Sequence, residues 1–368
     1  MKTFLNYNAS DLIKRLIEKE DSYQIVDFKD SLKIIKKRRW GKDAPIILPK
    51  QIKISPEVVG LIVGEGFIGE RHFVFANSNE RVIKTVKEFL IQLGLPIRNY
   101  LEISIKNQSK NFIKECKDFW EKNENIKIER IRLRKEFNNT TEHGTIHLAL
   151  YNTLVSKLLK HIIELSKKKI EKNKKLSIGY LRGILAAEGN INVKKKTKCV
   201  YMVRISASKK EEREHYKKCL ERIGMKIYCK DMPTVTKEES KIKKWKTAKG
   251  RAGAVIISRW ENFIKILELN LLELHKDKDK KFRKYILNNK FTTLFLSMDG
   301  LQKKRFTMKE FQTYTRLSGR SVGRLLTLCK KGYIGRRLIK NKYIYTLNKK
   351  YFDLLNRLTS SPFFQSST

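Results

Sequence analysis

Two segments of the chain share one pattern of apolar, small and acidic positions. VVGLIVGEG at residues 58–66 and LRGILAAEG at residues 181–189 are apolar runs with small residues four positions apart, and each closes with a glutamate and a glycine. Residues four apart lie on the same face of an α-helix, so each segment would present a flat side to a second backbone. We therefore predict a helix pair whose contact is made by Gly60, Gly64, Gly183 and Ala187.

The segments that follow the two motifs also match each other. Residues 67–79 and 190–208 alternate apolar and polar positions around a turn, which predicts two β-hairpins. Each hairpin runs into an amphipathic helix, at residues 80–94 and 209–224. A single small-xxx-small pattern is common and indicates only close packing. The same order of motif, hairpin and helix recurs with the closing glycines 123 residues apart, which indicates a duplicated unit.

The acidic residues of the motifs are candidate metal ligands. If the two helices pair, Glu65 and Glu188 emerge together at their C-terminal ends, beside backbone carbonyls that have no partner within a helix. We count the carbonyl oxygens of Gly64 and Ala187 among these. Carboxylate and carbonyl oxygens are the ligands of hard divalent cations, so the pattern predicts a metal site there.

At this point the chain resembles the LAGLIDADG homing endonucleases in their single-chain, two-motif form, over roughly residues 44–285. Glu65 and Glu188 fall on the last acidic position of the family motif, which binds the catalytic metal, whereas Val63 and Ala186 occupy the earlier acidic position. The resemblance implies an α+β fold of two pseudo-symmetric αββαββα halves that form a saddle of antiparallel sheets. It also implies a monomer that makes double-strand breaks in DNA at specific sites with Mg²⁺, or Mn²⁺ as a substitute.

Family members also carry a lysine or a polar residue that positions the attacking water. In this chain the candidates for that catalytic role are Lys276 and Lys278, with Ser78 and Ser208 at the hairpin ends. The first half shows no clear basic counterpart of Lys276.

The charge of the chain favours a nucleic-acid partner. Lys and Arg number 82 against 38 Asp and Glu, a formal net charge of +44, for which a polyanion is the natural complement. A general lysine bias spread over solvated faces is the alternative, but the hairpins concentrate polar donors on one face. The residues expected to contact double-stranded DNA are Asn190, Asn192, Lys194, Arg204, Ser206 and Ser208 in the second half and Asn77 and Ser78 in the first. The first-half face is less polar, so unequal contact is expected.

The C-terminal segment predicts a further DNA-binding unit. Residues 308–347 have the order helix, turn, helix and two-stranded hairpin, which resembles a winged helix-turn-helix. Arg320 and Arg324 would lie near the start of its second helix, and Arg336 and Arg337 in its wing. An accessory helical domain that is basic only through general composition is the alternative.

The domain organisation predicted from these patterns has four parts. They are a basic N-terminal segment at 1–50, the first half at 51–172, the second half at 173–288 and the winged-helix-like domain at 289–368. We expect short amphipathic helices in the first part, a lysine-rich linker at 166–177 and a basic loop at 241–251.

The chain has no apolar run long enough to span a bilayer and no signal-peptide core, so we expect an intracellular protein that is not secreted. The five cysteines form no C-x-x-C pair and are expected to be free thiols.

Two other functions remain open at this stage. Some bacterial regulators join a degenerate LAGLIDADG domain to a helix-turn-helix and bind DNA without cutting it. An intron splicing helper, or maturase, would use the same basic surface on intron RNA. The two retained acids favour the nuclease, because a carboxylate among backbone phosphates repels them unless a metal lies between.

Overall fold

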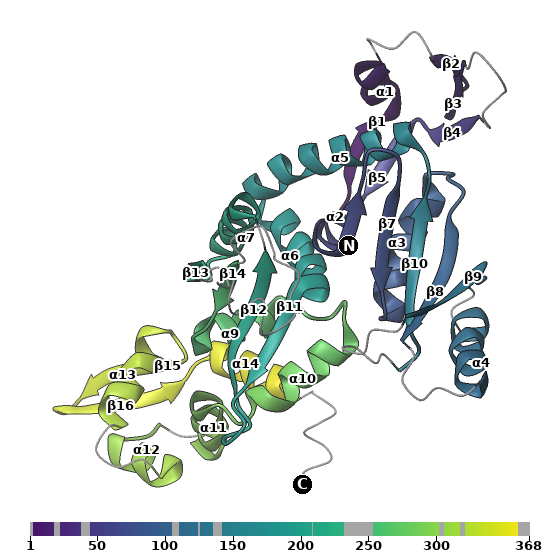
Figure 1. Cartoon of the computed structure of the whole chain (residues 1–368). Coiled ribbons are helices and arrows are strands. Elements are labelled where there is room, and N and C mark those ends of the chain that lie inside the picture. The colour runs from purple at the N-terminus through teal and green to yellow at the C-terminus, as the bar shows by residue number, and fades with distance from the viewer. Residues whose placement is uncertain are drawn as a thin grey trace. The chain divides into compact units, whose positions relative to one another are not determined.

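The computed structural model describes the chain as two compact units (Figure 1). The first contains Met1–Gly189, Ile205–Val255 and Leu271–His275, and the second contains Asn190–Arg204, Ile256–Asn270 and Lys276–Thr368. The residues described are 3–17, 23–37, 45–104, 110–123, 126–134, 142–207, 209–231, 253–301, 305–316 and 321–359. Over these residues the fold is mixed α+β and its sheets are antiparallel, apart from one parallel pair of strands.

Both motif helices begin and end at residues suited to those positions. Helix α2 (Pro56–Glu65) is capped by Ser55, whose hydroxyl accepts a hydrogen bond from Val58 N at 3.2 Å, and proline occupies its first turn. Helix α6 (Lys174–Glu188) is capped by the Asn173 side chain. Each helix ends at its glutamate, because the following glycine adopts an extended conformation and begins a strand.

The first half is built on a five-stranded sheet among the described strands. Its order is β6-β7-β10-β8-β9, and the edge pair β8 and β9 is parallel. Alternate residues such as Phe73 and Phe75 are fully buried beneath helices, so period-two patterning sets the core face. The elements are β6 (Gly66–Ile68), β7 (Phe73–Asn77), α3 (Glu80–Gln92), β8 (Arg98–Ser104), α4 (Lys110–Asp118), a π-helical turn (Phe119–Asn123), β9 (Arg130–Arg134), β10 (Thr145–Leu150) and α5 (Thr153–Lys172).

The second half repeats the motif, hairpin and helix order. Its described strands form a sheet of order β11-β12-β14-β13, and β12 and β14 each pass from one unit into the other. The predicted hairpin is present, closed by a hydrogen bond from Lys194 N to Cys199 O at 3.0 Å. The elements are β11 (Gly189–Val193), β12 (Val200–Ala207), α7 (Lys210–Arg222), β13 (Tyr228–Asp231), β14 (Gly253–Ile257) and α9 (Trp260–Glu268).

The N-terminal segment differs from the expectation of short helices. Residues 9–17 are helical, as predicted, but residues 23–36 form a β-hairpin that β4 extends to three strands. Leu32 and Ile34 are buried at alternate positions, so period two governs this segment rather than a helical period. The elements are β1 (Leu5–Asn8), α1 (Ala9–Ile17), β2 (Tyr23–Asp27), β3 (Ser31–Lys36), β4 (Ile46–Pro49) and β5 (Gln51–Ile54), with β1 paired to β5.

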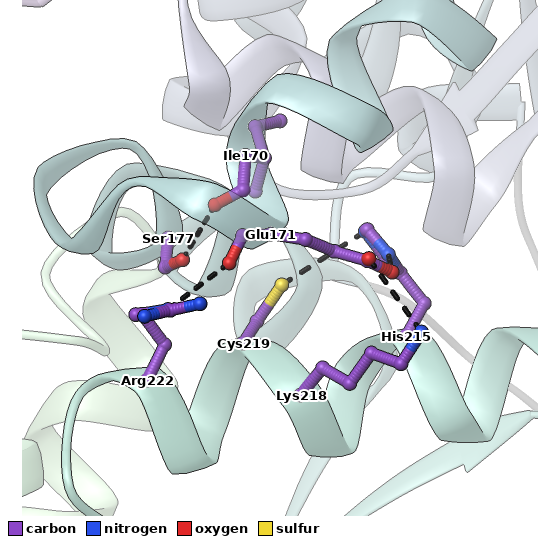
Figure 2. Close-up of polar contacts among 7 residues, drawn as sticks. All are labelled: Ile170, Glu171, Ser177, His215, Lys218, Cys219 and Arg222. Carbon is purple, nitrogen blue, oxygen red and sulfur yellow. Dashed lines mark hydrogen bonds and ion pairs between the residues drawn. The ribbon is translucent and has the colours of Figure 1, made fainter.

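The lysine-rich segment 166–177 is helical rather than a loose linker. It comprises the end of α5 and the start of α6, joined at Asn173. Figure 2 shows how α7 ties this junction: His215 Nδ1 lies 2.7 Å from Glu171 Oε1, and Arg222 Nε donates to the Glu171 carbonyl at 3.1 Å. Burial lowers the pKa of His215 although Glu171 opposes that shift, and burial raises the pKa of the neighbouring Cys219 to about 12.

The C-terminal elements follow the predicted order. The two helices and the hairpin predicted for residues 308–347 are α12 (Met308–Thr315), α13 (Ser321–Lys330), β15 (Ile334–Ile339) and β16 (Lys342–Leu347). They are preceded by α10 (Lys276–Ile286), α11 (Lys290–Ser297) and a 3₁₀ turn (Asp299–Leu301), and followed by α14 (Lys349–Thr359). The Trp260 ring of α9 contacts Phe295 and Tyr333, and its Nε1 donates to Thr292 Oγ1 at 3.1 Å. These residues therefore share one core with α9. No described helix is both long and apolar enough to cross a membrane.

Candidate metal centre and nucleic-acid interface

The two motif helices pack backbone against backbone. Figure 1 shows α2 beside α6, and the small residues explain how closely they approach. A Cβ added at Gly60 would lie 2.3 Å from the Tyr180 carbonyl oxygen, and one added at Gly183 would lie 2.2 Å from the Glu57 carbonyl oxygen. No side chain fits such a gap, so both positions require glycine.

The same contact continues to the C-terminal ends of the helices. A Cβ on Gly64 would lie 2.5 Å from Ala187 Cβ and 3.4 Å from Glu188 Cγ, so the stem of Glu188 lies against the last turn of α2. Glu65 ends that same turn, and both glutamates are partly exposed. The C-terminal ends of α2 and α6, each of which carries one of the two glutamates, therefore adjoin.

A buried amide holds one of the carboxylates. Asn77, at the end of β7, donates its side-chain N–H to Glu65 Oε2, and its Oδ1 accepts from Asn79 N at 2.6 Å. The Asn77 side chain is only 8% exposed. A side chain buried against Glu65 orients that carboxylate, and the predicted contact of Asn77 with DNA stays a prediction.

The negative charge of Glu188, the second carboxylate, affects the pKa of a buried tyrosine. Burial raises the pKa of Tyr216 on α7, and the negative charges of Glu212 and Glu188 raise it further. Tyr216 therefore stays a neutral phenol.

Ion pairs fix the other end of the helix pair. Arg182 of α6 lies 3.0 Å from Glu273 and 3.8 Å from Glu57 of α2, measured between charged atoms. Arg81 donates to the Glu273 carbonyl at 2.7 Å. With glycine contacts in the middle and ion pairs at this end, the helices cannot slide without breaking several contacts.

The donor set suits a hard cation. Within the described residues no group of three or more His, Cys, Asp or Glu side chains could hold a metal by itself. Glu65 and Glu188 with neighbouring carbonyls offer oxygen atoms only, which suits Mg²⁺, Mn²⁺ or Ca²⁺ and not a thiolate-bound metal. Such a site leaves coordination positions for water and for phosphate oxygens.

The two lysines predicted to position the attacking water belong to the second compact unit, whereas Glu65 and Glu188 belong to the first. Lys276 is exposed in the first turn of α10, and Lys278 is half-buried beside it. Their assignment therefore stays a prediction. Ser78 is exposed immediately after β7, and Ser208 lies outside the described residues.

The second hairpin has the alternation expected of a DNA-binding face. Ile191, Val203 and Ile205 are buried, whereas the intervening polar residues reach solvent. Asn190 and Lys194 are exposed, and Asn192, Arg204 and Ser206 are half-buried.

The first sheet carries a basic stripe that sequence reasoning missed. Strand β9 presents Arg130, Arg132 and Arg134 at alternate positions, all exposed, at the edge of the sheet. Arg132 lies over the Tyr100 ring, with Cζ 4.1 Å from its centroid. The signal was the alternation RIRLR at 130–134, which predicts a strand with one basic face. The two halves therefore differ less in basic character than the first hairpin suggested.

The arginines predicted to contact DNA from the winged-helix-like region, residues 308–347, differ in exposure. Arg336 and Arg337 are exposed on β15, with Arg336 Cζ 3.4 Å from the Tyr343 ring centroid, and Arg324 on α13 is half-buried. Arg320 lies outside the described residues.

Comparison with known proteins supports part of this picture. Residues 175–286 match the family model of the LAGLIDADG-like domain. That match covers α6 with Glu188, the second hairpin and the elements up to α10. No curated protein matches the chain.

Among solved structures, the homing endonuclease I-DmoI in complex with DNA and Mn is 14% identical, with a TM-score of 0.34, and the alignment covers 59% of this chain and 94% of that one. Mesophilic variants of I-DmoI give the same identity, coverage and TM-score.

Proposed function

We propose that the protein is a site-specific DNA endonuclease that hydrolyses phosphodiester bonds with a divalent metal. The observation that carries this proposal is the pairing of α2 and α6, which brings Glu65 and Glu188 to adjoining helix ends. The LAGLIDADG-like match over 175–286 supports the same assignment for the second half.

The carboxylates of Glu65 and Glu188, with the carbonyl oxygens of Gly64 and Ala187, would hold Mg²⁺, or Mn²⁺ in its place. When bound, the metal supplies an activated water at neutral pH and neutralises charge on the leaving oxygen. One carboxylate comes from each half, so a single chain provides for both strands of a duplex and would act as a monomer.

The remaining residues position the acids and the DNA. The glycine contact sets the separation of the helix ends, and the Asn77 amide fixes the direction of the Glu65 carboxylate. The arginines of β9 in the first half, and the polar face of β11 and β12 in the second, would each neutralise phosphates. Lys276 or Lys278 would place the water in the second half.

The C-terminal unit would add a second DNA contact as a winged helix. Its support is the observed order of α12, α13 and the β15–β16 hairpin, with Arg336 and Arg337 exposed on the hairpin. Because its core is shared with α9, it would act as a fixed extension of the second half rather than as a detachable domain.

A cleavage assay on a randomised library of duplex DNA with Mg²⁺ tests the proposal. We expect a defined subset of sequences to be cut on both strands. If the protein enriches a sequence by binding but cuts none of it with Mg²⁺ or Mn²⁺, the chain is a DNA-binding regulator. If it binds structured intron RNA in preference to every duplex, the maturase alternative holds.

A further inference from the structure

A cavity of about 420 Å³ lies in the first unit, outside the candidate metal centre. One wall comes from the N-terminal strands and includes Tyr23 and Lys36, and the opposite wall includes Arg71 and Tyr151 at the end of the five-stranded sheet. The walls are held together where Gly94 meets strand β4: a Cβ on Gly94 would lie 2.9 Å from the Ile47 carbonyl oxygen. The cavity therefore exists because of the β2-β3-β4 sheet, which sequence reasoning did not expect.

The lining combines flat apolar surfaces with positive charge. Most of the lining consists of two tyrosines, two prolines and aliphatic side chains. Lys36 and Arg71 supply two positive charges. The described lining residues include no carboxylate. Lys36 Nζ lies 5.6 Å from the Tyr23 ring centroid, so charge and ring adjoin. A volume of this size with aromatic walls and a few polar groups is typical of a site for a small planar ligand, and two cations favour one that bears a phosphate.

An exposed row of planar side chains leads across the sheet to this cavity. Phe67 is 60% exposed and Tyr151 is 56% exposed, and His72 lies between them with ring centroids 5.4 and 6.1 Å away. Arg98 Cζ lies 5.6 Å from the Tyr151 ring. Exposed aromatic rings in series, flanked by arginine, are the usual platform on which the unpaired bases of a strand stack.

We propose that the cavity holds one unpaired nucleotide of a nucleic-acid strand that lies along the Phe67–His72–Tyr151 row. The base stacks on Tyr151, and Arg71 and Lys36 contact its phosphate. This inference rests on the nucleic-acid partner of the proposed function, but not on cleavage or on the metal-binding glutamates. Tyr151 belongs both to the row and to the cavity, which favours a nucleotide within a strand over a free nucleotide.

Short oligonucleotides with a single 2-aminopurine test the proposal on the full-length protein. Single-stranded DNA, single-stranded RNA and a fully paired duplex of the same sequence are compared with free 2-aminopurine nucleotide. We expect stacking on Tyr151 to quench the fluorescence of the single strands, and the stronger of the DNA and RNA responses identifies the source of the strand. Equal binding of the free nucleotide overturns the assignment to a strand.

Variants separate this site from general affinity. Tyr151→Leu should abolish the quenching and weaken single-strand binding about tenfold while leaving duplex binding unchanged, since one base stack is lost. Arg71→Gln should weaken binding and retain the quenching. Phe28→Leu, at an exposed aromatic residue between β2 and β3, is the control and should change neither. Tyr151 is more than half exposed, so circular dichroism of Tyr151→Leu should match the wild type.

Two results would contradict the proposal in different ways. If the wild type binds single strands but Tyr151→Leu quenches and binds equally well, the cavity is not the site, and the proposed endonuclease function is untouched. If the wild type binds no nucleic acid at all, both proposals fail. The Glu65→Gln protein should quench like the wild type, because the site does not use the metal.

Discussion

The close approach of α2 and α6 at Gly183 gives the sharpest prediction. Gly183→Ala would place a methyl group 2.2 Å from the Glu57 carbonyl oxygen and 2.8 Å from Leu61 N, both backbone atoms of α2. A carbon normally approaches an oxygen no closer than about 3.3 Å, so the helices must part by roughly 1 Å. Overpacking costs about 1 to 3 kcal/mol, and the upper end applies because neither neighbour is a flexible side chain. Alanine recovers about 1 kcal/mol of helix propensity.

The net loss is about 2 kcal/mol, which should lower the unfolding temperature by roughly 4 to 8 °C. The parted helix ends should also slow cleavage about 100-fold, since catalytic groups tolerate little displacement. Gly323→Ala is the matched control, because Gly323 lies within α13 with nothing within 4 Å of an added Cβ, and it should stabilise the protein by about 1 kcal/mol. Thermal unfolding measures the stability of both variants, and cleavage kinetics measure the rate. A Gly183→Ala protein as stable and active as the wild type would refute the close contact.

Three further predictions concern separate parts of the molecule. Asn77→Leu should slow cleavage about tenfold with duplex affinity unchanged, since the Glu65 carboxylate loses its buried amide partner. Cleavage kinetics and a binding titration check this, and an unchanged rate would show that Asn77 does not position Glu65. Burial lowers the pKa of His215, so the unfolded chain binds a proton before the folded chain does as the pH falls below about 6.5. The free energy of unfolding, measured with urea, should therefore decrease as the pH falls below that value, and it should decrease less steeply in His215→Gln. Equal slopes in the two proteins would contradict the burial argument. Replacing Arg336 and Arg337 by glutamine should flatten the dependence of log affinity on log salt by about 0.9 per lost phosphate contact, and an unchanged slope would show that the hairpin does not touch DNA.

Short-range patterns in the sequence predicted the elements around the candidate site. The four-residue spacing of small residues predicted the helices α2 and α6, and period-two alternation predicted both hairpins, because these signals depend on residues close in sequence. The contact between Gly60 and Gly183 could be predicted because the motif occurs twice in the chain.

Contacts between distant segments could not be predicted in the same way. The N-terminal hairpin was misread because its lysines imitate an amphipathic helix, and only pairing with β4 decides the period. Alternation placed Asn77 near the end of a strand but could not show that its amide reaches Glu65. Strand β9 pairs parallel to β8 across an intervening helix, a long-range pairing that its arginine-rich sequence conceals. Likewise, nothing local to Trp260 predicts that Phe295 and Tyr333 pack against it.

The most direct test of the account is the rate of double-strand cleavage, measured with Mg²⁺ on a plasmid carrying a selected target, for Glu65→Gln and Glu188→Gln separately. Each change removes a charged metal ligand and, with it, a repulsion from phosphate, while the amide keeps the shape of the side chain. We predict that each variant loses double-strand cleavage and binds the target as tightly as the wild type or slightly more tightly. An unchanged cleavage rate in either variant would contradict the assignment of these two glutamates as the metal centre.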